Sequence, residues 1–550
     1  MSRRQVLAAG GTGLLATTAN ATRAAARTRK VRAAGGDGTP EQIHLTWGEN
    51  PATGVVVSWA SPEAATRPRV RIGQRVIEAE PRQYTDGING ETVWTYHARV
   101  AGLRPGATYA YALTADNDGN AADPFTATFR TAPHGRAAFR FTLDLATPST
   151  SSILSYGQSA YAVDAVESFQ PLFHLLNGDL CYADLNPTVQ PEVWRDFGNN
   201  NQTSAANRPW MPCLGNHEVE FGNGAQGFTS YLTRYTLPDN KVPGFGGRWY
   251  RFRIGSVLFV CLDADDVVYQ DAGAFVAGPA PLTPAGSTNN PAIEPGTSFY
   301  IRGYSGGAQT AWLERTLAAG RRDDSVDWIV VQMHQCACSS SATGNGSDLG
   351  IRQQWLPLFD RYQVDLVLSG HDHDYERSFP VRGADANAGH EVATGAVVDT
   401  LRPHPVTTTD NGVFDTSQGT VHLILGCGGT DAPLDEYGTD TADSQRQAKV
   451  FTQANRPMAT SVAGVFTRAA PDAVEDAVWS AKRDTTTGYG IAVFDVHPDP
   501  EDFGGRPAIT VTQYHAVGAD PVNPATGTKG APTPDYTEFE TFTLIRPRRG

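Results

Sequence analysis

Cysteine is scarce in this chain, which has six cysteines among 550 residues. Scaffolds built on disulfides are short and dense in cysteine, so this protein must instead be held together by a packed core. Cys336 and Cys338 are separated by one residue, but no second cysteine pair follows at the spacing of a zinc ribbon. Buried or singly bridged thiols are therefore the expected state of the cysteines.

Long apolar runs and excess positive charge are also missing. After the N-terminal segment, no apolar run reaches the roughly 18 residues of a membrane span, so none is predicted. The chain has 44 Lys and Arg against 58 Asp and Glu, and the net charge of -14 argues against a general binder of nucleic acids or anionic membranes. The length and the 40% of hydrophobic residues predict two globular domains with peripheral segments.

Residues 1–35 are predicted to be an export signal and linker. Arg3 and Arg4 precede a weakly apolar stretch at 6–19, and an A-x-A cleavage pattern follows at 19–21. The paired arginines and the glycine- and threonine-diluted apolar region resemble the twin-arginine signals with which bacteria export folded proteins. A disordered basic tail is the alternative. The prediction is an exported protein that is secreted, periplasmic or held in the cell envelope.

Residues 40–133 are predicted to form an all-β sandwich, because short strand-like runs alternate there with turn signals. The expected strands cover residues 42–47, 54–59, 70–72, 92–100, 109–115 and 125–131. A turn delivers an alternating strand that carries Tyr109 and Tyr111, which resembles a fibronectin type III module with a tyrosine corner. No chemistry is evident in this domain, so a structural or adhesive spacer is the expected role.

Residues 137–546 are predicted to form a second, α/β domain, because buried apolar strands alternate with helical stretches after a hinge at 131–135. Helices are expected at 308–317 and 351–362, and Pro357 should kink or reset the second. Segments 264–306 and 383–418 are rich in Gly, Pro, Ala and Thr, and we expect long loops that serve a site or are mobile.

Five apolar strands of this domain end in residue types that bind metals. The ends are Asp144 after 139–144, Asp179 and Tyr182 after 172–178, Asn216 after 210–215, His334 after 328–333, and His371 and His373 after 364–370. Strand ends of an open α/β sheet gather around one crevice, so these side chains can converge. Any one motif could be an ordinary turn with satisfied histidines, but five together favour a metal site. Seven ligands are too many for one transition ion, and Asp179 can bridge two.

The motifs also stand in a familiar order. Gly178-Asp179-Leu-Cys-Tyr182, Gly215-Asn216-His217-Glu218, His334, Gly370-His371-Asp-His373 and Tyr375-Glu376-Arg377-Ser378 resemble the motifs of the purple acid phosphatases. The resemblance covers roughly residues 40–546 and implies the two-domain form. Its fold would be the sandwich followed by a metallophosphoesterase domain, α/β or α+β, with sheets flanked by helices.

The resemblance implies a ligand set for each of two ions. Asp144, Asp179, Tyr182 and His373 would hold Fe(III), while Asp179, Asn216, His334 and His371 would hold a divalent Fe, Zn or Mn. The sequence departs from the family at one point, since Leu143 stands where the first motif usually has glycine. A glycine there relieves crowding near the metals, so the departure bears on how Asp144 is placed.

The implied function is an acid phosphatase that hydrolyses phosphate monoesters with a metal-bound hydroxide. By the same resemblance His217 would contact the phosphate or protonate the leaving group, and orienting the Asn216 loop is its alternative role. The expected partner is a small phosphate ester and no nucleic acid, with the oligomeric state left open. The remaining histidines, His174 among them, lack ligand spacing and are expected to be packing or surface residues.

Two rival functions remain open at this point. One is an exported alkaline-type phosphodiesterase or phosphatase of the wider metallophosphoesterase group, and the position of Tyr182 three residues after Asp179 argues against it. The other is a non-catalytic cell-surface binding protein that uses the sandwich domain. A complete ligand set argues against that alternative.

Overall fold

The fold is described from a computed structural model. It describes residues 36–120, 122–144, 159–220, 222–224, 227–270, 303–341, 345–426, 446–452, 456–457, 466–467, 473–484, 490–517 and 535–548. The predicted export signal and Cys427 lie outside these residues, and the other five cysteines are buried and unbridged. Within the described ranges, no helix combines the length and the apolar character needed to cross a membrane.

The N-terminal domain is the predicted all-β sandwich. One sheet has the order β1 (Glu41–Thr46), β2 (Val55–Ser61), β6 (Thr92–Val100), β5 (Glu80–Thr85), and the other β4 (Arg75–Glu78), β3 (Arg69–Ile72), β7 (Thr108–Thr114), β8 (Thr126–Arg130). The sequence had indicated all of these strands except β4 and β5. The tyrosine corner is also present, because the backbone N–H of Arg104 donates to the Tyr109 hydroxyl over 2.8 Å.

Two seven-stranded sheets form the second domain. The first has the order β11 (Trp210–Pro212), β10 (Phe173–Leu176), β9 (Phe139–Asp144), β29 (Gly490–His497), β30 (Ala508–Val517), β31 (Asp535–Ile545), β22 (Val413–Asp415). The second has the order β12 (Tyr250–Ile254), β13 (Val257–Cys261), β14 (Trp328–Gln332), β16 (Leu366–Ser369), β23 (Val421–Leu425), β17 (Tyr375–Ser378), β28 (Ser480–Arg483). Neighbouring β9, β10 and β11 run parallel, as do β13, β14, β16 and β23. Each parallel set therefore presents its carboxyl ends at one edge.

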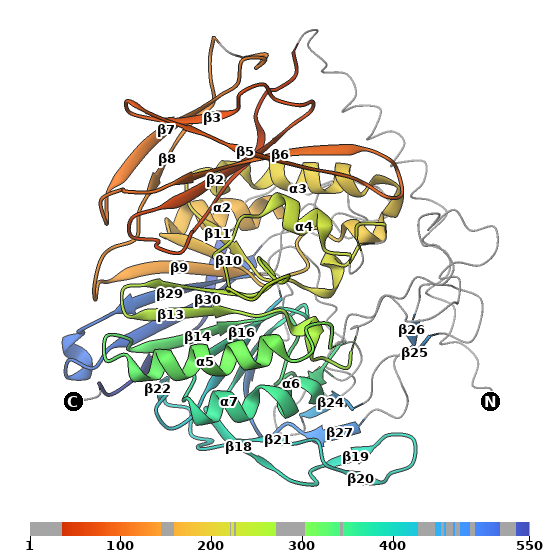
Figure 1. Ribbon diagram of the computed structural model, residues 1–550. Helices are drawn as coiled ribbons and strands as arrows, with labels where there is room; N and C mark the ends of the chain where they lie inside the picture. The colour runs from red at the N-terminus through yellow and green to blue at the C-terminus, as the bar shows by residue number, and fades with distance from the viewer. Residues whose placement is uncertain are drawn as a thin grey trace.

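The sheets stack face to face with helices outside both, as Figure 1 shows. Between them, Phe141 and Phe173 of the first sheet meet Phe259 of the second edge-on at 5.3 Å between ring centroids. The outer helices are α2 (Ser159–Phe169) and α3 (Gln190–Ala205) on one side, and α5 (Ala308–Arg322), α6 (Leu349–Gln354) and α7 (Leu356–Arg361) on the other. Two helix predictions are confirmed: α5 contains 308–317, and Pro357 stands in the first turn of a new helix, α7, after a break at Trp355. The predicted fold class is confirmed.

The expectation of a long loop at 383–418 is wrong. This segment begins within β18 (Val381–Asp385) and contains β19 (Gly389–Glu391), β20 (Val397–Val398) and β21 (Arg402–Pro405). β19 pairs with β27 (Ala473–Asp476), more than eighty residues further along the chain. Such short strands are stabilised by distant partners, which local composition does not reveal. The other expected loop, 264–306, lies mostly outside the described residues.

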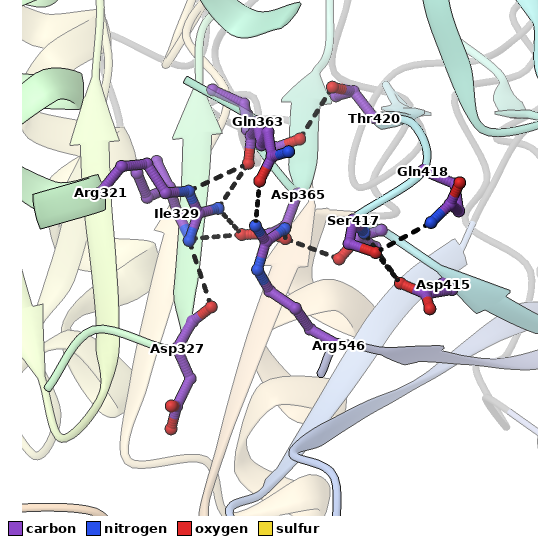
Figure 2. A network of polar contacts seen from close by, with 12 residues as sticks. Arg321, Asp327, Ile329, Gln363, Asp365, Asp415, Ser417, Gln418, Thr420 and Arg546 are labelled. Atoms are coloured by element: carbon purple, nitrogen blue, oxygen red, sulfur yellow. Dashed lines mark hydrogen bonds and ion pairs between the residues drawn. The ribbon is translucent and has the colours of Figure 1, made fainter. Parts of the chain in front are cut away.

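A buried ionic network fixes the amino-terminal end of β16, at the edge remote from the strand ends that carry the metal-binding residue types. Figure 2 shows Asp365 between Arg321 of α5 and Arg546, which follows β31. Its carboxylate accepts from Arg321, from Arg546 Nη1 at 2.6 Å and from the backbone N–H of Ile329 at 2.7 Å. Asp365 is fully buried. The network therefore ties α5, the start of β14 and the C-terminal segment to one central strand.

Candidate metal centre

The carboxyl ends of the two parallel strand sets meet at one edge of the stacked sheets. Asn177, which follows β10 in the first sheet, donates its amide to the carbonyl of Ser369 at the end of β16 over 2.9 Å. The ring Nδ1 of His334, after β14, lies 2.5 Å from the carbonyl oxygen of Asn177. These bonds join the two sheets directly beneath the loops that carry the predicted ligands.

Three of the predicted ligands form the centre of the site. One ligand atom each from Asp179, His334 and His371 lies within 4.8 Å of the others, and all three side chains are buried. Asp179 Oδ2 is 2.9 Å from His334 Nε2, and that nitrogen is 3.0 Å from His371 Nδ1. Burial opposes ionisation of Asp179, but the neighbouring charges of His334 and His217 outweigh it and lower the pKa of the carboxyl. A charged carboxylate and two imidazoles therefore face one buried point.

Tyr182 and His373 lie together beside this centre. The Tyr182 hydroxyl is 3.0 Å from His373 Nε2, and the tyrosine ring is 1% exposed. Tyr182 has a left-handed backbone, with φ of 54°, which is uncommon for a residue other than glycine. Burial lowers the pKa of His373 to about 3, so its ring is neutral and able to act as a ligand.

Asp144 and Asn216 contribute buried oxygens that have no hydrogen-bond partner in the described part of the chain. Asp144 ends β9 beside Leu176 of β10, and its Oδ2 has no hydrogen-bond partner among the described residues. Asn216 Oδ1 is in the same situation. Leaving a buried acceptor unsatisfied costs about 1–3 kcal/mol. Leu143 does not crowd the site, because its side chain is buried in the main hydrophobic cluster. Successive side chains of a strand point to opposite faces of the sheet, so Asp144 faces away from that cluster.

The loops after β10 and β11 hold one another through a reciprocal set of hydrogen bonds. The Glu218 carboxylate accepts from the backbone N–H groups of Asp179, Leu180 and Gly215 at 2.8, 2.6 and 2.7 Å. In return, Asp179 Oδ1 accepts from the backbone N–H of His217 at 2.9 Å. Burial and the Asp179 charge raise the pKa of Glu218 well above its usual range, whereas its three N–H donors favour the ionised form. A cation at Asp179 would offset the Asp179 charge and so reduce that conflict.

Two glycines allow these loops to approach so closely. A Cβ at Gly215 would lie 2.3 Å from Asp179 Oδ1. Gly178 has φ of +85°, and a Cβ there would lie 2.8 Å from His334 Nδ1. Any side chain at either position would therefore push apart the residues that define the centre.

His217 stands at the mouth of the centre in a pair with Asp184. Its Nδ1 is 2.8 Å from Asp184 Oδ2, its ring lies 4.5 Å from the Tyr182 ring, and its side chain is 24% exposed. Burial would lower the pKa of His217, but the carboxylates of Asp184 and Asp179 raise it to about 10. Asp184 occupies one ring nitrogen, which leaves Nε2 as the atom that can meet a substrate.

The donor set fits a pair of metal ions. Carboxylate, phenol and amide oxygens suit hard, highly charged ions, and imidazoles suit Fe, Zn or Mn. Asp144 ends β9 and Asn216 follows β11, so cations bound at this edge could satisfy acceptor oxygens that have no partner in the described part of the chain. All seven predicted ligands lie on loops or strand ends at the same edge.

Three residues around the centre were not singled out by sequence reasoning. His174, expected to be a packing or surface residue, is buried with Nε2 at 3.2 Å from Asp144 Oδ1. His174 lies on β10, the strand that pairs with the β9 strand ending in Asp144, and this position could have identified it as a neighbour of the site. Asp184 follows Tyr182 by two residues, and Glu218 closes the Gly-Asn-His-Glu motif, but their contacts depend on left-handed loop geometry at Asp179 and Tyr182 that the sequence does not announce.

Comparison with protein families agrees with this architecture. Residues 40–131 match the purple acid phosphatase N-terminal domain, and residues 144–375 match the calcineurin-like phosphoesterase family. An uncharacterized protein of Mycobacterium tuberculosis is 40% identical over 92% of this chain and 87% of its own length. The Fe(3+)-Zn(2+) purple acid phosphatase 12 of Arabidopsis thaliana is 24% identical over 68% of this chain and 73% of its own.

Solved structures show the same fold at low sequence identity. A purple acid phosphatase from yellow lupin (Lupinus luteus) seeds has a TM-score of 0.57 at 16% identity, with 92% of this chain and 74% of that chain covered. PhoD has a TM-score of 0.54 at 12% identity, with 92% and 90% covered. The fold alone is compatible with either structure. The family matches of the two domains and the named plant relative, however, both indicate the purple acid phosphatases. The chain belongs to the purple acid phosphatase family of binuclear metallophosphoesterases, in the form with an N-terminal sandwich domain.

Proposed function

We propose that this protein is an exported acid phosphatase that hydrolyses small phosphate monoesters at a centre of one Fe(III) and one divalent Fe, Zn or Mn ion. The observation that carries the proposal is the convergence of Asp179, His334 and His371 on one buried point. The Tyr182 and His373 pair lies alongside. A two-metal phosphoesterase needs ligands for both ions, and the buried side chains at this edge of the molecule support the proposal.

The family resemblance distributes the ligands between the ions. Asp144, Asp179, Tyr182 and His373 are proposed for Fe(III), and Asp179, Asn216, His334 and His371 for the divalent ion. Tyr182 favours this assignment over a generic pair of divalent ions, because a phenolate is a hard ligand suited to a trivalent ion. When bound, the ions lower the pKa of coordinated water and neutralise charge on the phosphoryl oxygens.

His217 is the proposed catalytic acid. Asp184 is bound at its Nδ1, which leaves Nε2 available to a substrate, and in the metal-free protein the carboxylates of Asp184 and Asp179 raise the pKa of the ring to about 10. A protonated imidazole can donate its proton to the leaving-group oxygen throughout the acidic and neutral range. Its positive charge also favours a doubly charged monoester over a singly charged diester.

Ligand variants test the proposal. Asn216→Ala and His334→Ala should each lower divalent metal content and reduce hydrolysis of a phosphate monoester at least a hundredfold, while the protein stays folded. His390→Ala is the matched control, because His390 is an exposed histidine on β19. Full monoesterase activity in either ligand variant at controlled metal content would refute the assignment, and a preference for diesters would refute the substrate class.

The export proposal has its own test. Replacing Arg3 and Arg4 with lysine should trap the precursor inside the cell, because the twin-arginine route depends on both guanidinium groups. Normal export of that variant would remove the proposed route and leave the catalytic assignment untouched.

A further inference from the structure

The side chain of Asn223 joins three separate segments of the molecule. Its amide nitrogen lies 2.9 Å from Asp86 Oδ2, 3.0 Å from Gln190 Oε1 and 2.7 Å from Glu220 Oε2. All four side chains are at most 1% exposed. A buried polar network of this kind fixes the relative positions of its members, because each loses its partner if one moves.

The first segment belongs to the N-terminal sandwich. Asp86 lies at the tip of the β5–β6 hairpin, and its other carboxylate oxygen accepts from the backbone N–H groups of Ile88 and Asn89 at 2.9 Å each. The next residue, Gly87, touches the catalytic domain so closely that a Cβ there would lie 2.2 Å from the carbonyl oxygen of Gly222. The hairpin tip therefore sits directly against the loop that follows Glu220.

The other two segments carry the two members of the Asp184–His217 pair. Gln190 begins α3, six residues after Asp184, and the chain between them forms two short 3-10 turns. Glu220 lies three residues after His217 and also accepts from the indole N–H of Trp194 on α3. Asn223 thus connects the segment that carries Asp184, the segment that carries His217 and the sandwich domain.

We propose that the N-terminal sandwich is a positioning element for catalysis, which sets the geometry of the Asp184–His217 pair through the Asp86–Asn223 contact. The inference rests on the proposed function, because the pair matters only where His217 meets the substrate. It goes beyond the expected role of a structural or adhesive spacer. A spacer joined by a flexible hinge would not need a buried carboxylate and a glycine contact against the loop that continues from the active site.

A glycine-to-alanine comparison tests the proposal with substitutions that lie only in the sandwich domain. Gly87→Ala places a methyl group against Gly222, whereas Gly48→Ala in the same sandwich meets nothing within 4 Å. A displacement of about 1 Å at a catalytic group can cost on the order of a hundredfold in rate. We expect Gly87→Ala to lower kcat by at least tenfold, with KM within about threefold of wild type and metal content unchanged. Gly48→Ala should match wild type.

Asn223→Leu is the second variant, since it keeps the branched shape of the side chain, with larger methyl groups in place of the polar atoms, and removes its hydrogen bonds. It should reproduce the fall in kcat. Hydrogen exchange provides a readout that needs no substrate: backbone amides of 179–184 and 216–220 should exchange faster in Gly87→Ala than in Gly48→Ala.

The outcomes separate the two proposals. Lower melting temperatures with wild-type kcat and wild-type exchange at these amides would overturn the positioning role and leave the sandwich as a structural support. If wild type and Gly48→Ala both fail to hydrolyse phosphate esters, the proposed function fails. The hydrogen-exchange comparison still decides whether the sandwich domain orders segments 179–184 and 216–220.

Discussion

Glu218→Gln isolates the contribution of the carboxylate that clamps the Asp179 and Asn216 loops. The substitution keeps the shape of the side chain but replaces one acceptor oxygen with an NH₂ group. If the amide oxygen takes the place of Oε2, the bonds from Asp179 and Gly215 persist, and the NH₂ group faces the N–H of Leu180. One charge-assisted hydrogen bond is then lost, at a cost of about 1.5–3 kcal/mol.

That cost should appear as weaker metal binding, because Glu218 holds the backbone of the proposed ligand Asp179 and of Gly215, which precedes the proposed ligand Asn216. At 1.4 kcal/mol for each factor of ten, the loss corresponds to roughly a 10- to 100-fold weaker affinity for the divalent ion. The assay is competition of wild type and variant against a chelator of known affinity, with thermal unfolding measured in parallel.

Glu475→Gln is the control. Glu475 is also fully buried, but it accepts from Arg352, Thr400 and Trp479, none of which is a proposed ligand. The control should lower the melting temperature and leave metal affinity unchanged. The reasoning fails if Glu218→Gln binds the divalent ion within about threefold of wild type, or if both variants weaken binding equally.

Two further predictions concern pH and stability. In metal-free protein, the raised pKa of His217 contributes stability that is fully present below about pH 6.5 and is lost as pH rises through about 10. Asp184→Asn should therefore lower the melting temperature clearly near pH 6 and much less above pH 10, and a difference that does not vary with pH would contradict the pairing. Asp365→Asn should lower the free energy of unfolding by about 3–5 kcal/mol in a denaturant titration, because it removes the carboxylate that two buried guanidinium groups share. Asp116→Asn, which removes a partly exposed partner of Arg69, should cost at most about 1 kcal/mol, and equal losses would show that burial of the network is not the cause.

The general position of the site could be predicted from the sequence because parallel strands impose it. Each predicted ligand follows an apolar strand, and the rule that carboxyl ends meet at one edge needs no knowledge of the loops. Asp179 and His334, 155 positions apart in the chain, lie 2.9 Å apart for this reason. The same rule placed Asp144 correctly at the edge, although Leu143 departs from the family pattern.

The features that escaped prediction depend on distant partners or on unusual backbone geometry. β4 and β5 are largely exposed and charged, so they show little of the alternation that marks a half-buried strand. The clamp by Glu218 requires left-handed backbone at Gly178 and at Asp179, where φ is 51°, and only the folded loop shows it. The contact between Asp86 and Asn223 spans 137 positions and two domains. No local sequence pattern predicts a hydrogen bond between side chains so far apart in the chain.

The central claim is most directly tested by the metal content and visible spectrum of the purified protein, compared with Tyr182→Phe. A phenolate bound to Fe(III) absorbs visible light by charge transfer, and Tyr182 lies beside His373 where the ferric ion is proposed. The account predicts two metal ions per chain, at least one of them iron, and a visible band that disappears in Tyr182→Phe while the divalent ion is retained. Wild-type protein that is colourless with stoichiometric iron, or a band that persists unchanged in Tyr182→Phe, would contradict it.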